Sequence, residues 1–365
     1  MKKVFIPVLA VLTAVALAAC SPSTPAAPPA SGAPASSGAA PASGFKLGIV
    51  IPSGDHGFTG ESVAHAKAEA DAQMAADKNL KITVKDGIDA QAQIASIENM
   101  LANNKPDMIM LWPMEGEALR SAAQSIIDAK VKLVIYDRLI TNFQGLSGQI
   151  MGDNVSIGKG MGEYITKYFA NDAKVNYLRF VGDSSTVTSQ RSDGMDGVID
   201  KAKFVQINQT FSTDWSLQKA QDQMEQWLNS KSKAEIEGLS LIVSHDDEIT
   251  QGVYNALDAY TGPAKINVKL ITSVGGREET LQAAERSKTG AKLTTWYFAP
   301  SFIRESVRLS VDVLKGVPYT GAKETDGVYL IPSFSISNAG NADKDFAGYR
   351  GSDIYKERYS IKLPG

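Results

Sequence analysis

The sequence has little of several features that would narrow its function. Its 365 residues include one cysteine, Cys20, and three histidines. Without a second cysteine the chain forms no internal disulfide, and the histidines lack the spaced partners of a zinc site. Neither His56 nor His245 is therefore expected to bind a metal. The formal charge of −3, with both signs mixed, argues against nucleic acid or an anionic membrane surface as a partner.

Long apolar segments are also absent after Cys20. Before it, Lys2 and Lys3 precede an apolar stretch that is shorter than the roughly 20 residues needed to span a bilayer, which predicts a signal peptide over residues 1–19. The string Leu17-Ala18-Ala19-Cys20 resembles the lipobox of bacterial lipoproteins, whose cysteine is lipidated. We expect Cys20 to be lipidated and to be the only membrane anchor of an extracytoplasmic protein, the alternative being a free thiol.

Residues 20–44 are expected to be a spacer. After Cys20 they are almost entirely Ser, Pro, Ala, Gly and Thr, a composition that buries too little surface to fold. At roughly 3 Å per residue, an extended spacer would hold the folded part some tens of ångströms from a membrane. The alternative is that these residues do not act as a spacer and have no function of their own.

From Phe45 onward, short apolar runs alternate with amphipathic segments, which predicts an α/β fold. The predicted strands are 46–52, 81–85, 107–112, 132–136, 174–181, 204–208, 239–244, 268–272 and 293–297. The predicted helices are 62–76, 90–103, 116–129, 156–170, 216–229, 249–260 and 302–314. This number of strands fits two Rossmann-like lobes with parallel sheets better than one sheet.

Ligands of open α/β sheets bind beyond the carboxyl ends of the strands, so the residues that follow each predicted strand are candidate contacts. Aromatic rings, carboxylates and arginines recur there, and they suit a small polyhydroxylated ligand. Rings can stack on a sugar while Asp and Arg bind its hydroxyls. The predicted contacts are Asp55, His56, Phe58, Trp112, Asp137, Arg138, Arg191, Trp215, Asp246 and Phe298.

Some of these positions have a structural alternative. One carboxylate of Asp246-Asp247 is expected to cap a helix. Gly275-Gly276 fits a turn, and Trp227, at helical spacing from Met224, fits packing. The sequence leaves open whether Glu115 and Arg277 contact a ligand or only line a cleft.

The order of these motifs resembles the type I periplasmic sugar-binding proteins of bacterial ABC transporters, in particular the ribose- and xylose-binding group. The segments that carry the resemblance are Gly54–Phe58, Ala95–Leu101, Tyr136–Ile140, Gly152–Asn154 and Asp246–Glu248. It implies that Asp137, Arg138 and Arg191 hold sugar hydroxyls and that Trp215 and Phe58 stack on the sugar ring.

The chain departs from this group at three places. Asp246 stands where the relatives have an asparagine, Gly275-Gly276 where they usually have an aspartate, and Phe298 where they have Gln or Lys. The loss of polar side chains and the gain of an aromatic ring indicate a less polar or differently shaped ligand.

The resemblance implies two lobes joined by three hinge crossings, near 152–154, 299–300 and 331–333. The first lobe would comprise residues 45–152 and 299–331, and the second 153–298 and 332–365. We expect a monomer without a cofactor that captures a monosaccharide and delivers it to a permease and its ATPase.

Two other functions fit parts of this sequence. The same fold presents ligands to chemoreceptors or histidine kinases, which the sequence does not separate from transport. A hydrolase would need two carboxylates with different pKa values, such as Asp137 and Asp246 or Asp247, but Arg138 and Arg191 would keep them ionised. We therefore expect no enzyme. The export signal, in place of a helix-turn-helix, excludes a repressor of related fold.

Overall fold

The computed structural model describes residues 44–54 and 57–361. The predicted signal peptide, Cys20 and the spacer as far as residue 43 lie outside the described residues, as do Asp55 and His56. Within the described part, no helix has the length and apolar character needed to cross a membrane.

The first of two sheets has seven strands, which pair in parallel except for β12 with β13 at one edge. In spatial order they are β12 (Lys323–Thr325), β13 (Val328–Ile331), β5 (Gly148–Gly152), β4 (Lys132–Tyr136), β3 (Met108–Leu111), β1 (Lys46–Pro52) and β2 (Lys81–Gly87).

Helices cover both faces of this sheet, because alternate strand residues point to opposite sides. Ile49 and Ile51 of β1 join the core that contains α1 (Gly57–Ala76) and α10 (Ile303–Lys315). Val50, between them, joins a separate core with α2 (Ala90–Asn99) and α3 (Arg120–Asp128). Consecutive residues of β1 are therefore apolar and buried, as expected for a strand of a sheet that helices cover on both faces.

The second sheet has eight strands, of which only β14 runs antiparallel to its neighbour β11. The order is β15 (Lys344–Asp345), β14 (Ser335–Ser337), β11 (Lys292–Tyr297), β10 (Leu270–Gly275), β9 (Leu239–Ser244), β6 (Val175–Val181) and β7 (Phe204–Gln206), with β8 (Phe211–Ser212) also paired to β6. The helices of this lobe are α4 (Asn154–Tyr168), α5 (Thr186–Asp196), α6 (Leu217–Ser230), α7 (Lys233–Glu237), α8 (Asp247–Ala259), α9 (Glu278–Arg286), α11 (Phe346–Arg350) and α12 (Asp353–Arg358).

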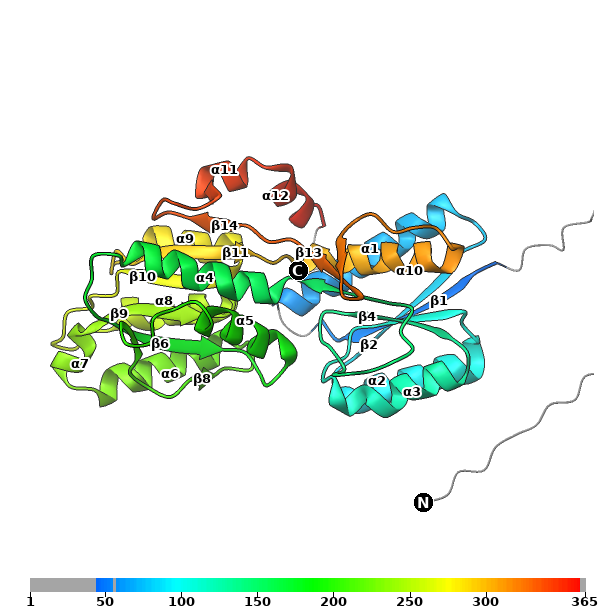
Figure 1. The fold of residues 1–365 in the computed structure, drawn as a ribbon, viewed down its shortest axis with the longest axis horizontal. Coiled ribbons are helices and arrows are strands. Elements are labelled where there is room, and N and C mark those ends of the chain that lie inside the picture. The colour runs from blue at the N-terminus through cyan, green and yellow to red at the C-terminus, as the bar shows by residue number, and fades with distance from the viewer. Residues whose placement is uncertain (1–43, 55–56, 362–365) are drawn as a thin grey trace, which may run out of the picture. The chain divides into compact units, whose positions relative to one another are not determined.

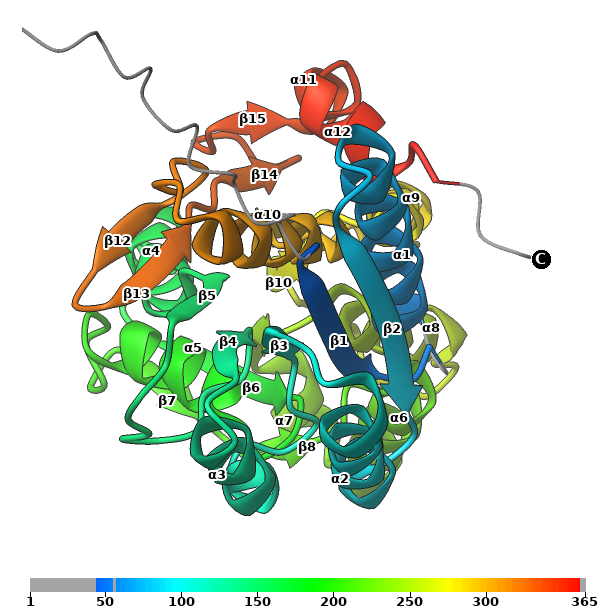
Figure 2. The ribbon, with the colours of Figure 1, turned by 90° about the vertical axis from the view of Figure 1, so that its right-hand side faces the viewer.

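The chain passes between the two lobes three times. It leaves the first sheet after β5, returns after β11, and leaves again after β13. Because of the return, α10 lies beside α1 and β13 beside β5 although they are far apart in sequence (Figures 1 and 2). The predicted three-crossover architecture is confirmed, and the crossings fall where the resemblance implied. The exact division of the chain into lobes stays a prediction.

The predicted strands are all present, and β1, β4 and β9 have the predicted bounds. The sheets are mostly parallel, as predicted, and the exceptions are the antiparallel pairs of β12 with β13 and of β14 with β11. The helix predicted to reach Asn103 changes at Met100 into a π-helical turn that ends before Lys105, whose φ is 46°. The sequence did not predict β5, β8, the strands β12 to β15, or helices α5, α7, α9, α11 and α12.

Candidate functional site

A single cavity collects the predicted contacts that the structure describes. It has about 500 Å³ of empty space, a volume that includes its opening to solvent. Eight of the ten predicted residues line it, and Asp55 and His56 lie outside the described residues. The lining residues are Phe58, Thr59, Trp112, Asp137, Arg138, Val187, Arg191, Trp215, Asp246, Glu248 and Phe298.

Sequence reasoning missed three members of this lining: Thr59, Val187 and Glu248. Thr59 and Glu248 adjoin predicted contacts, so their neighbours were the available signal. Val187 lies on α5, a helix that the sequence did not predict. Both lobes contribute side chains, because each sheet presents its carboxyl edge to the cavity.

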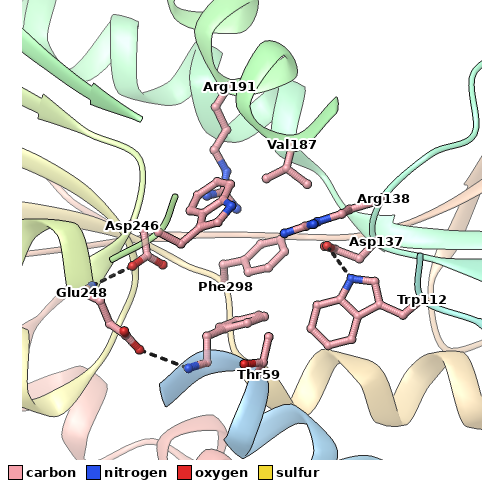
Figure 3. A pocket seen from close by; sticks show the side chains of 11 residues that line it. Thr59, Trp112, Asp137, Arg138, Val187, Arg191, Asp246, Glu248 and Phe298 are labelled. Carbon is pink, nitrogen blue, oxygen red and sulfur yellow. Dashed lines mark hydrogen bonds between the residues drawn. The ribbon is translucent and has the colours of Figure 1, made fainter. Parts of the chain in front are cut away.

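Asp137 is positioned directly after β4 by a left-handed backbone, with a φ of 65°. One carboxylate oxygen accepts a hydrogen bond of 3.1 Å from the indole Nε1 of Trp112 (Figure 3). The other, Oδ1, is buried and has no partner among the described residues. Burial raises the pKa of Asp137, although Arg138 and Arg191 oppose this. An unpaired buried acceptor is costly, so a ligand hydroxyl that donates to it would gain affinity.

Arg138 connects the lobes at the edge of the cavity. Its guanidinium donates to the carbonyl of Met114 in the first lobe and lies 3.1 Å from the carboxylate of Asp183 in the second. Burial alone would raise the pKa of Asp183, but the charge of Arg138 and hydrogen bonds from its neighbours make it lower than usual. Arg138 is thus fixed by a contact that requires both lobes to be close together.

Arg191 is held almost completely buried on α5, with 2% of its surface exposed. Nε donates to Asn154 Oδ1 at 2.9 Å and one terminal nitrogen to the carbonyl of His245 at 2.5 Å. The guanidinium carbon lies 4.7 Å from the ring centre of Phe298 and 5.8 Å from that of Trp215. Burial lowers the pKa of Arg191 to about 10 in spite of attraction to Asp246 and Asp137.

Trp215 reaches the cavity from a strained turn. Asp214 and Trp215 both have positive φ, of 49° and 62°. Such backbone is unfavourable for a bulky residue and occurs mainly where function requires it. Gly182 makes room for the indole, because a Cβ at that position would lie 1.9 Å from the ring.

Phe298 follows β11 at the second crossing and lies in the middle of Figure 3, between Arg191 and Trp112. Its ring stacks on Phe58, with centroids 5.7 Å apart and an interplanar angle of 29°. Gly152, at the first crossing, allows this position, since a Cβ there would lie 2.2 Å from the Phe298 ring. The aromatic side chain that replaces a polar one in the resemblance therefore lies within the cavity.

The N-terminus of α8 supplies Asp246 and Glu248. Asp246 caps the helix through a 2.7 Å hydrogen bond from the backbone of Glu248, and it also lines the cavity, so both predicted roles are compatible. Burial, Glu248 and Asp247 raise its pKa to about 7. Glu248 accepts a 3.1 Å bond from the backbone of Phe58 in the other lobe and pairs with Arg277 at 2.8 Å.

The other sequence candidates lie elsewhere. Glu115 lines a separate surface groove, and Arg277 pairs with Glu248 behind the cavity wall. Trp227 is in the core. The turn expected at Gly275-Gly276 is not present, because Gly275 is the last residue of β10 and Gly276 follows it, with φ of 150° and 77°. Among the described residues no group of His, Cys, Asp and Glu could hold a metal ion. Burial keeps the pKa of His245 well below its usual value, with Arg191 adding to the effect.

Comparison with known families identifies the fold. Residues 47–317 match the family model described as a periplasmic binding protein domain. The chain belongs to this family. The resemblance to its type I, sugar-binding branch agrees with the curated relatives. The D-xylose-binding periplasmic protein of Haemophilus influenzae is 25% identical over 214 residues, which are 57% of this chain and 60% of that protein. The ribose import binding protein RbsB of Salmonella typhimurium is 24% identical over 247 residues, or 67% of this chain and 78% of that protein.

The alignment with the D-xylose-binding relative therefore spans about three fifths of that protein. Among solved structures, a Mycobacterium smegmatis protein in complex with β-D-fucofuranose has a TM-score of 0.70 at 15% identity, covering 87% of this periplasmic binding protein and 97% of that chain. A carbohydrate transporter solute-binding protein of Chloroflexus aurantiacus has a TM-score of 0.69 at 15% identity, with 87% and 98% covered. These structural likenesses show the type I fold.

Proposed function

We propose that this protein is an extracytoplasmic solute-binding component of an ABC importer that holds one monosaccharide between its lobes. The observation that carries the proposal is the cavity itself. It combines four aromatic rings with Asp137, Arg138, Arg191 and Asp246, the combination that suits stacking on a sugar and bonding to its hydroxyls. The names of the curated relatives, which include xylose- and ribose-binding proteins, support the same ligand class.

Contacts between the lobes support a closing motion. Besides Arg138 with Asp183, the backbone of Leu139 donates to Thr186 at 3.1 Å and that of Phe58 to Glu248 at 3.1 Å. Each of these pairs joins the first lobe to the second. A ligand that touches both lobes would favour this closed arrangement, and a membrane permease with its ATPase would recognise the closed form.

Calorimetric titration of the purified mature protein against pentoses, hexoses and polyols tests the proposal. We expect one equivalent of a monosaccharide to bind, without turnover, because one cavity collects the aromatic and charged side chains of both lobes. The D137L variant, which removes the unpaired acceptor Oδ1, should bind the same sugar more weakly. No heat from any member of the panel would contradict the sugar assignment and leave the fold untouched.

A sensor function is the second candidate. One structure of the same fold, with a TM-score of 0.66 and 18% identity, is the fructose-binding periplasmic domain of a hybrid two-component system. Uptake of the bound sugar into vesicles that contain a partner permease and ATPase would favour import. Activation of a membrane kinase by the liganded protein would favour sensing. We propose no enzymatic activity, because the matched family and its curated relatives are named as binding proteins. The expectation that Arg138 and Arg191 keep the cavity carboxylates ionised was wrong, since burial raises the pKa of Asp137 and that of Asp246.

The anchoring role of Cys20 is a separate proposal. If Cys20 is the lipidated residue, the C20S variant should leave the membrane fraction and become soluble outside the cytoplasm. Its ligand affinity should be unchanged, because the described residues that line the cavity all lie at Phe58 or beyond, far along the chain from Cys20. Fractionation followed by calorimetry measures both. A C20S protein that stays in the membrane, or one with altered affinity, would contradict the separation of anchor and binding domain.

A further inference from the structure

One wall of the cavity is made of aromatic rings in mutual contact. Phe58 stacks on Phe298 at 5.7 Å and meets the edge of Trp112 at 6.2 Å and 84°. The only polar atom of these three side chains, Nε1 of Trp112, donates to Asp137. The wall itself therefore offers no free side-chain hydrogen-bonding group to a ligand.

The charged groups beside this wall already have partners. Glu248 accepts from the backbone of Phe58 and from Arg277. Arg138 binds the carbonyl of Met114 and the carboxylate of Asp183. Arg191 donates to Asn154 and to the His245 carbonyl, and its guanidinium carbon lies 4.7 Å from the centre of the Phe298 ring, which also stabilises the cation.

The carboxylates of Asp137 and Asp246, in contrast, each have an oxygen that can accept a hydrogen bond from a ligand. Asp137 Oδ1 is buried without a partner among the described residues, and the Asp246 side chain uses Oδ1 to cap α8, which leaves Oδ2 for a ligand. Figure 3 shows Asp137 and Asp246 on opposite sides of Phe298. Hydroxyl groups of a ligand thus find acceptors at these carboxylates, whereas a hydroxyl against Phe58 and Phe298 loses water and gains no partner from that wall.

We propose that the ligand is a sugar with an apolar group against Phe298, namely a deoxyhexose whose methyl group replaces a hydroxymethyl, and that Phe298 determines this specificity. The proposal rests on the proposed function and names its substrate class. A methyl group packs on the rings without a desolvation penalty, while the corresponding hydroxyl would be buried unpaired. Apolar pockets disfavour an added hydroxyl by roughly 100-fold at most, so we expect a preference of about 10- to 100-fold.

Matched sugar pairs test the proposal with the unaltered protein. Each pair differs only at carbon 6: D-fucose with D-galactose, L-rhamnose with L-mannose, and 6-deoxy-D-glucose with D-glucose. Calorimetry of the mature protein should find the tightest-binding sugar among the deoxy members, with its hydroxylated partner about 10- to 100-fold weaker. If the tightest hexose binds as well as or better than its deoxy counterpart, the inference is wrong although the sugar-binding function stands. If no sugar binds, the proposed function and the inference both fail.

A variant assigns the preference to one side chain. F298Q supplies an amide donor and acceptor at the wall, so the affinity ratio of the deoxy to the parent sugar should fall towards one. F143Q is the control, because Phe143 is a partly exposed phenylalanine packed on the separate core of α2 and α3. Its ratio should equal that of the unaltered protein. An F298Q protein that binds sugar with an unchanged ratio would overturn the role of Phe298.

Discussion

Replacement of Arg191 by methionine is expected to weaken ligand binding at least about 100-fold. The guanidinium lines the cavity, and its third nitrogen, Nη2, makes no hydrogen bond to a described residue. A ligand hydroxyl or ring oxygen that bonds to it would make a charge-assisted contact, and truncation of one partner of such a buried pair costs roughly 2–5 kcal/mol.

The same substitution is expected to change the free energy of unfolding by less than about 2 kcal/mol, because two effects oppose each other. Methionine leaves Asn154 Oδ1 and the His245 carbonyl without their donor. It also removes a charge whose burial is unfavourable, as the lowered pKa of about 10 shows. The residue is therefore expected to be retained for binding more than for stability.

Arg179→Met is the matched control for this prediction. Arg179 is also a buried arginine of the second lobe, but it pairs with Asp196 away from the cavity. Burial lowers its pKa, yet the bond to Asp196 outweighs this and the net pKa is raised. Its loss should cost roughly 2 kcal/mol of stability without altering affinity. Equal affinity losses in R191M and R179M would show that both act through general destabilisation.

The predicted site residues were found with one rule, which is that ligands of open α/β sheets bind at the carboxyl ends of the strands. Apolar strands such as Lys132–Tyr136 end in charged residues, and parallel strands bring their carboxyl ends to one edge. That rule brought Asp137 and Asp246, which are over 100 positions apart in the chain, into one cavity. The rule operates locally, so it needs only that the strand is recognised.

The elements that the sequence did not predict have weak local signals. Helix α5 contains Val187 and Met195 among mostly polar residues, so its sequence shows no clear apolar period, although it carries Arg191 and Val187 to the site. Strand β5 is Gly-Gln-Ile-Met-Gly and is stabilised by tertiary contacts. A Cβ at Gly148 would lie 3.3 Å from Leu309 of α10, which shows how closely a distant helix packs on this strand. Such contacts cannot be read from neighbouring residues.

The contacts of charged residues across the cavity could not be predicted from the sequence either. Glu248 was part of a recognised motif, but its hydrogen bond from the backbone of Phe58 depends on how the two lobes meet. Its pair with Arg277 joins two distant segments of the second lobe. The sequence also could not show the raised pKa of Asp246, because it depends on burial in the folded protein next to two other carboxylates of α8. The sequence showed a carboxylate in place of an amide, and the structure shows that its environment favours the neutral form.

Asp246 is expected to make the stability of the protein depend on pH, with an effect on the order of 4 kcal/mol between pH 4 and pH 8. Its pKa of about 7 in the folded state exceeds the ordinary value of 3.8. Below pH 4 both folded and unfolded states are protonated at this residue, and its full contribution is present. As the pH rises towards 7, only the unfolded state releases the proton, so stability is lost. Asp247 and Glu248 on α8 favour the neutral form, and Arg191 from α5 opposes it.

Two buried histidines act in the opposite direction and would mask this effect in the unaltered protein. Burial, aided by Arg304, lowers the pKa of His65 to about 4, and burial with Arg191 lowers that of His245 further. Their contribution to stability is lost as the pH falls below about 6.5. The effect of Asp246 is therefore to be read as the difference between D246N and the unaltered protein.

D246N keeps the size of the side chain and an oxygen that can accept the cap hydrogen bond from Glu248, but it does not titrate. Chemical denaturation at several pH values should show that the stability of D246N relative to the unaltered protein grows from pH 4 to pH 7 and then stays constant. D193N, at an exposed position of α5, is the control and should give a nearly constant difference. A constant difference for D246N as well would mean that Asp246 is ionised throughout this range.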